Sequence, residues 1–91
     1  KPPMPGSPGS FEIQVLRGRA SFELGRHEEA TAAFETARKL KPSSADPLVG
    51  LGLISHAHSR LEEALARYDE ALALVPRDTE AWYRKGEALR E

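Results

Sequence analysis

Three histidines are the residues of this chain whose type could most readily bind a metal ion or move a proton. His56 and His58 are two residues apart in a stretch with a helical pattern, so their side chains point about 200° apart on a helix. Such a pair cannot close on one metal ion, as histidines at positions i and i+4 can. His27 lies near an expected turn. We therefore expect solvated histidines and no metal site.

Adjacent carboxylates, which could share acid–base work, occur where helices are expected to begin. The pairs are Glu28–Glu29 and Glu62–Glu63. Negative charge in the first turn is stabilised by the helix dipole, and this accounts for both pairs without catalysis. The sequence contains no cysteine, no glycine-rich phosphate loop and no strand on which a nucleophilic serine elbow could form. It predicts no catalytic residue, no cofactor and no enzyme activity.

Composition narrows the classes of function further. The chain has 91 residues and a formal net charge of -1, which suits one small domain and argues against nucleic acid, whose phosphates require a basic face. No apolar run approaches the roughly 20 residues that cross a bilayer. Because nothing ties a cysteine-free chain to an oxidising compartment, we expect the cytoplasm by default, with a periplasmic or membrane-associated parent protein as the alternative.

Prolines, glycines and other turn-forming residues divide the chain into five expected helices. The first ten residues contain four prolines and two glycines, and they predict a flexible tail or linker over residues 1–10. Pro8 could instead mark the end of an upstream repeat. The expected helices run from Phe11 to about Leu24, from about His27 to the stop at Pro42, from Pro47 to the turn at Ser59, from Leu61 to Val75, and from Glu80 to Arg90.

Local signals indicate how these helices begin, end and pack. Ile13, Leu16 and Ala20 recur at helical spacing and are expected to form the buried face of the first helix. Gly25 is expected to adopt the left-handed conformation after the last turn. Asp46, followed by Pro47, is expected to cap the third helix, and Asp78 or Thr79 the fifth.

A period of 34 residues organises the whole chain. Gly18, Gly52 and Gly86 are spaced by this period, and an alanine, an aromatic residue, an alanine and a proline repeat with it. Recurrence at a fixed period is typical of repeat proteins, in which each unit buries its apolar face against the next. Because a glycine inside a helix costs about 1 kcal/mol relative to alanine, its recurrence suggests close contact between paired helices. The matching residues are Ala30, Phe34, Ala37 and Pro42 in the first unit and Ala64, Tyr68, Ala71 and Pro76 in the second.

In these residues, together with Leu51, Trp82 and Leu89, the chain resembles the tetratricopeptide repeat family. The resemblance covers Phe11–Glu91 and implies an all-α fold, a right-handed α-solenoid of antiparallel helix pairs. We expect a repeat domain over residues 11–91, with repeats at 11–44 and 45–78 and a partial repeat or capping helix at 79–91. The chain departs from the family pattern mainly in the first helix of each pair, which suggests loose packing or an edge unit. These positions are Gln14, Arg17, Ser21, Leu48 and Ser55.

The resemblance also implies a concave groove that holds a peptide or helix of a partner protein. Carried over by position, its lining falls on the first helix of each unit. The candidate residues are Glu12, Val15, Arg19, Phe22, Asp46, Val49, Leu53, His56, Glu80, Tyr83, Glu87 and Arg90. This lining has an apolar centre and a mixed charged rim, which suits an apolar or amphipathic segment.

Family members that bind the C-terminal carboxylate of heat-shock chaperones use a clamp of Lys, Asn and Arg side chains. At the matching positions of this chain only Arg19 fits that clamp. The resemblance therefore predicts that this chain does not use it. The other positions hold Val15, Val49, Leu53, Tyr83 and Glu87.

The leading hypothesis for function is a protein-interaction scaffold without catalytic activity. The alternative is a self-assembly unit, in which the terminal helix, carrying Trp82 and Leu89, stacks on a second copy. A third hypothesis makes the chain the regulatory arm of a larger enzyme.

Overall fold

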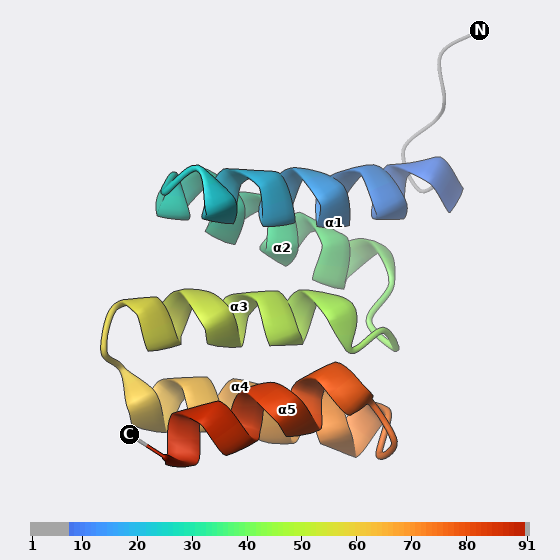
Figure 1. Cartoon of the computed structure of the whole chain (residues 1–91). Helices are drawn as coiled ribbons and strands as arrows, with labels where there is room; N and C mark the ends of the chain where they lie inside the picture. The colour runs from blue at the N-terminus through green and yellow to red at the C-terminus, as the bar shows by residue number, and fades with distance from the viewer. Residues whose placement is uncertain (1–7, 91) are drawn as a thin grey trace, which may run out of the picture.

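The computed structural model describes residues 8–90, and within this range the chain folds into five α-helices joined by short turns (Figure 1). No strand occurs among these residues, so the predicted all-α class is confirmed. The helices are α1 (Pro8–Glu23), α2 (His27–Leu40), α3 (Asp46–Ala57), α4 (Leu61–Leu74) and α5 (Thr79–Leu89).

The helices form two layers. In Figure 1, α1, α3 and α5 lie towards the viewer, while α2 and α4 lie behind them. Each helix packs against the next along the chain, and α3 also contacts α1 and α5. This stacking of antiparallel pairs is the solenoid arrangement that the 34-residue period predicts.

The turns within the first two helix pairs have the same backbone geometry. Gly25 takes the left-handed conformation at φ +81°, as predicted, and Ser59, one period later, takes it at φ +62°. In the first turn the N–H of Arg26 donates to the carbonyl of Ser21, and in the second the N–H of Arg60 donates to that of Ser55. Both turns are therefore Schellman motifs, which satisfy the last carbonyls of α1 and α3.

Three helix starts differ from the prediction, and that of α5 differs by one residue, at Thr79 instead of Glu80. Helix α1 begins at Pro8 rather than Phe11, because proline is compatible with a first turn, where its missing N–H has no partner to lose. The rest of the expected tail, residues 1–7, lies outside the described residues. Asp46 is the first residue of α3 rather than its cap, and Ala45 makes no side-chain capping bond. Asp78 does cap α5, with its Oδ1 accepting a hydrogen bond from the N–H of Ala81 over 2.9 Å.

Glycines let the paired helices approach closely at two of the three predicted positions. A Cβ atom built on Gly18 would lie 2.7 Å from Cε1 of Phe34, and one built on Gly52 would come closer still to the ring of Tyr68. Both distances are too short for a real carbon pair, so only glycine fits there. At Gly86 a Cβ atom would meet nothing within 4 Å, because no helix covers this face of α5 among residues 8–90.

The predicted buried face of α1 is wrong. Ile13, Leu16 and Ala20 are exposed, and α1 instead packs through Phe11 and Val15, which join Ala37 in the core. Apolar residues lie on both sides of this helix, so helical spacing alone cannot identify the side that meets α2.

The large apolar side chains of α5, Trp82 and Leu89, are exposed. This helix is anchored instead by its alanines, which lie in the core around Tyr68. That core contains Ala45, Leu48, Val49, Ala64, Tyr68, Ala71, Ala81 and Ala88.

Candidate functional site

A hollow of about 440 Å³ lies among the helices of the front layer and collects side chains from all three of them. We call it the groove hollow. Because α1, α3 and α5 run side by side in that layer (Figure 1), residues far apart in the sequence meet there. The lining residues are Arg19, Phe22 and Glu23 from α1, Phe34 from α2, Leu53, His56 and Ala57 from α3, and Glu80, Arg84 and Glu87 from α5.

Six of the twelve residues assigned to the groove from sequence line this hollow. They are Arg19, Phe22, Leu53, His56, Glu80 and Glu87. Val15 and Val49 are buried in the core, Val49 with 1% of its surface exposed, so neither offers its side chain to a ligand. The other four are exposed on the surface outside the hollow. These are Glu12, Asp46, Tyr83 and Arg90.

Sequence reasoning missed four of the lining residues. Glu23 and Ala57 are separated by the 34-residue period, one position after Phe22 and His56, so the period itself could have identified them. Phe34 was identified only as the aromatic residue of the 34-residue period, yet it also lines the hollow. Arg84 stands one period after Gly50, and a residue type that changes from glycine to arginine gives no signal in the repeat pattern.

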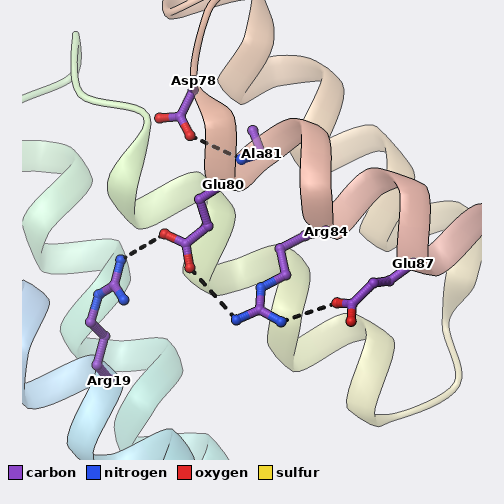
Figure 2. A network of polar contacts seen from close by, with 6 residues as sticks. All are labelled: Arg19, Asp78, Glu80, Ala81, Arg84 and Glu87. Carbon is purple, nitrogen blue, oxygen red and sulfur yellow. Dashed lines mark hydrogen bonds and ion pairs between the residues drawn. The ribbon is translucent and has the colours of Figure 1, made fainter.

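A ladder of charged side chains runs along the hollow (Figure 2). Arg19 of α1 donates through Nη2 to Oε1 of Glu80 of α5 over 3.0 Å, across 61 residues of sequence. The other carboxylate oxygen of Glu80 lies 3.8 Å from Nη2 of Arg84, and Nη1 of Arg84 lies 3.0 Å from Oε1 of Glu87. Each of these side chains is partly exposed, so each pair contributes at most about 1 kcal/mol to stability. Their main effect is to alternate positive and negative charge along the wall.

Hydrogen bonding within the ladder affects the ionisation of its last member. The hydrogen bond from Arg84 lowers the pKa of the Glu87 carboxyl group, and a hydrogen bond involving Tyr83 acts in the same direction. Glu87 therefore keeps its negative charge at neutral pH, and Arg84 stays held between two carboxylates.

Two buried hydrogen-bond donors near α5 have no acceptor among the described residues. They are Oη of Tyr68 and Nε of Arg84. Burial raises the pKa of Tyr68 to about 12, partly offset by the positive charge of Arg84. An unpaired buried donor costs roughly 1–3 kcal/mol. The polar side of the core beneath α5 is therefore less well satisfied than the rest of the molecule.

Aromatic and imidazole rings make a contact beside the hollow that the sequence did not predict. The ring of Phe22 stacks on His27 with centroids 5.4 Å apart, and Nδ1 of His27 lies 2.7 Å from Nε2 of His58. These histidines belong to neighbouring turns of the two repeats, so the contact depends on how the repeats stack. His56 lines the groove hollow, whereas His58 does not. Among residues 8–90, no group of three or more histidines, cysteines or carboxylates could hold a metal ion.

No described helix is long and apolar enough to cross a membrane.

Comparison with known families finds one model, described as tetratricopeptide repeat, that matches at residues 6–45, 15–73 and 57–91. Together these matches span nearly the whole chain, including all five helices. The curated relatives contribute a second line of similarity.

Two of these relatives come from distant organisms. Cellulose synthase operon protein C of Komagataeibacter xylinus is 31% identical over 80 residues, which is 88% of this chain but 6% of that protein. Superkiller protein 3 of Saccharomyces cerevisiae is 32% identical over 72 residues, or 79% of this chain and 5% of that protein. The chain thus spans only a small fraction of the length of the relatives it matches.

Proposed function

Because the chain belongs to the tetratricopeptide repeat family, we propose that it is a protein-interaction module whose groove hollow binds a peptide or helix of a partner protein, without catalysis. Repeats of this family generally mediate contacts between proteins. The observation that carries the proposal is that one hollow draws its lining from helices of three successive repeat units. A segment lying there would contact all three at once.

The chemistry of the lining indicates an amphipathic or apolar ligand. Phe22 and Leu53 are only half-buried and supply the apolar surface of the hollow. The charged residues of the lining are two arginines and three glutamates, and four of these five already pair with one another. Such a wall has little net charge with which to attract a strongly acidic or basic peptide. It favours an apolar face covered by Phe22 and Leu53, with polar groups meeting the ladder at the edge.

The size of the hollow sets an upper limit on affinity. A hollow of about 440 Å³ accommodates only a few side chains of a ligand. The area buried there is therefore expected to be smaller than the roughly 800 Å² per partner that a standard protein interface buries. Binding also has to offset the ordering of the ligand. We therefore expect dissociation constants in the micromolar range or weaker.

The proposal is tested by selecting ligands from a displayed peptide library and titrating the best peptide by fluorescence anisotropy. A Leu53→Glu variant places a charge in the apolar part of the hollow and is expected to weaken binding about tenfold or more. The matched control is Leu16→Glu, because Leu16 is exposed on α1 outside the hollow. Val49→Glu is unsuitable, since Val49 is buried in the core and its replacement would unfold the protein.

Two results would contradict the proposal. Binding that resists Leu53→Glu but is lost in Leu16→Glu would place the ligand on the outer face of α1. Tight binding of an acidic peptide with a free C-terminal carboxylate would show that the hollow acts as a carboxylate clamp despite its apolar lining. Circular dichroism of both variants checks that neither substitution has unfolded the helices.

A further inference from the structure

Two imidazole nitrogens from neighbouring repeats face each other where the turns of the two repeats meet. Nδ1 of His27, the first residue of α2, lies 2.7 Å from Nε2 of His58, which directly follows α3. The ring centroids are 4.8 Å apart, considerably more than the two nitrogens, so the rings meet edge to edge through these atoms. Imidazole nitrogens are ligands that suit Zn²⁺, Cu²⁺ and Ni²⁺. The pair therefore has the chemistry of a metal site with two protein ligands.

Packing of the repeats does not explain why both residues are histidines. The residue one period after His27 is Leu61, and the residue one period before His58 is Leu24. Leucine occupies both corresponding positions, so the fold itself requires no imidazole there. The sequence prediction of no metal site considered His56 with His58, which belong to the same repeat, whereas the facing pair joins two repeats.

Contacts with the rest of the protein hold the two histidines in place. The ring of Phe22 stacks on His27, with an angle of 18° between the two planes. The N–H of His58 donates to the carbonyls of Ile54 and Ser55 at the end of α3. The two nitrogens are thus brought together in the free protein, which reduces the cost of ordering them when an ion binds.

We propose that Nδ1 of His27 and Nε2 of His58 together bind one Zn²⁺ ion, which links the two repeats, with water in the remaining coordination positions. Two nitrogens bound to one tetrahedral zinc at about 2.0–2.1 Å lie roughly 3.3 Å from each other. The facing nitrogens must therefore move apart by roughly half an ångström. The side chain of His58 is exposed, so a small rotation of its ring can supply this distance.

Zinc binding changes the tautomer of one of the two rings. In the free protein, one facing nitrogen carries the proton of the contact between the rings and the other accepts it. Zinc needs a lone pair on both nitrogens, so the donor ring has to carry its proton on its other nitrogen, by exchange with water. Two neutral imidazoles stay neutral in this step, and no net proton is released.

The surroundings limit the site to two protein ligands and do not repel a cation. No third histidine, cysteine or carboxylate among residues 8–90 completes a group with the pair, so His56 lies outside the site. A hollow of about 170 Å³ lies beside His58, and its charged residues are two glutamates and two arginines. These are Glu35, Arg60, Glu63 and Arg67. With two protein ligands, zinc is expected to bind more weakly than at a structural site with four.

The first experiment titrates the full chain with zinc chloride alone, by calorimetry in mildly alkaline buffer, where imidazole is neutral. We expect one saturable site per chain. His27→Gln and His58→Gln each remove one ligand and should weaken binding about tenfold or more. His56→Gln is the matched control, because His56 lines the groove hollow instead, and it should bind zinc as the parent does. Circular dichroism checks that all three variants keep their helices.

Nuclear magnetic resonance of the ring nitrogens tests the geometry directly. Long-range proton–nitrogen spectra distinguish Nδ1 from Nε2 in each histidine. In the free protein, one of the two facing nitrogens should be protonated. Zinc should then shift Nδ1 of His27 and Nε2 of His58 and leave both nitrogens of His56 unchanged. A contact with only a structural role would give no such response to zinc.

Zinc held by both rings should also stabilise the folded chain, because the two nitrogens meet only when the repeats are stacked. An ion that binds only the folded state favours folding about a hundredfold when its concentration is one hundred times its dissociation constant. We expect the urea midpoint to rise with zinc in the parent and in His56→Gln, but not in His58→Gln. The site needs no peptide in the groove hollow, so this test is independent of the proposed function.

Four results would overturn the proposal. Zinc binding that is unchanged in His27→Gln and His58→Gln would place the ion elsewhere on the chain. Equal shifts of all three histidines would mean adventitious binding to separate surface rings, and so would saturation only at millimolar zinc. Zinc-dependent dimers in light scattering would show that the ion links two chains instead of two repeats of one chain.

Discussion

The first and second repeats place an aromatic ring at the same step of the period but in different surroundings. Phe34, in the first repeat, lies against glycines on both sides, Gly18 of α1 and Gly50 of α3. Tyr68, in the second, lies against Gly52, and the residue one period after Gly50 is Arg84. One ring is therefore packed between bare backbones. The other is influenced by the positive charge of Arg84 and carries a hydroxyl group that has no acceptor among the described residues.

The turn of the second repeat is also less favourable than the turn of the first. Both turns need a left-handed residue, and the first repeat supplies glycine at that position, whereas the second supplies Ser59. The second repeat thus combines a polar ring in the core with a strained turn. It also packs on both sides, because α3 contacts α1, α2, α4 and α5. Residues that are locally unfavourable are tolerated where packing against the surrounding helices determines the structure.

The largest effect is expected from removing the ring of the first repeat. Phe34 is 1% exposed, and the two glycines that face it have no side chains that could move into the space. Phe34→Ala should therefore lower the free energy of unfolding by about 3–5 kcal/mol, measured by urea denaturation. Phe22→Ala is the control, because Phe22 is only half-buried and should cost clearly less. A loss below about 1 kcal/mol for Phe34→Ala would show that the ring contributes little to the packing of the two repeats.

The next largest effect concerns the hydroxyl group of the second ring and depends on pH. The pKa of Tyr68 is raised from 10.0 to about 12 by burial. The folded state therefore holds the phenol proton more tightly than the unfolded state. The stability that this difference contributes is fully present below pH 10 and is lost as the pH rises from about 10 to 12. We expect a loss of order 2 kcal/mol over that window.

The measurement compares urea unfolding of the parent and of Tyr68→Phe across this pH range. Other groups titrate in both proteins, so only the difference between them reports Tyr68. In a Tyr83→Phe background Tyr68 is the only tyrosine, and phenolate absorbance gives its pKa directly. Equal pH dependence of the parent and of Tyr68→Phe would mean that the hydroxyl group reaches solvent.

Sequence periodicity predicted the features that are set by backbone geometry. Close contact at Gly18 and Gly52 and the left-handed Gly25 each follow from the residue type. The cap of α5 was narrowed to Asp78 or Thr79 in the same way, and the structure assigns it to Asp78. Such signals are short-range, so one sequence is enough to read them. The number of helices and their pairing followed from the same signals.

Features that depend on how the repeats face one another were not predictable. The apolar residues of α1 occur on two faces, and the choice between Leu16 and Val15 is made by contact with α2. The contact between His27 and His58 and the place of Arg84 in the groove hollow depend on long side chains that reach across repeats. A repeat pattern identifies the positions that are small or apolar in every unit. It does not predict the contacts of side chains that vary from unit to unit.

The smallest effect is expected from exchanging the residue types of the two turns. A non-glycine residue in the left-handed conformation costs roughly 1–2 kcal/mol, while glycine loses more backbone entropy on folding. Ser59→Gly should therefore raise the free energy of unfolding by about 0.5–1 kcal/mol, and Gly25→Ser should lower it by a similar amount. Both turns make the same Schellman hydrogen bonds, and a Cβ atom at Gly25 would meet nothing within 4 Å. The effect of each exchange is therefore expected to come from the cost that a side chain adds to the left-handed conformation. Urea midpoints that move in the same direction for both variants would show that something other than the left-handed backbone distinguishes the two turns.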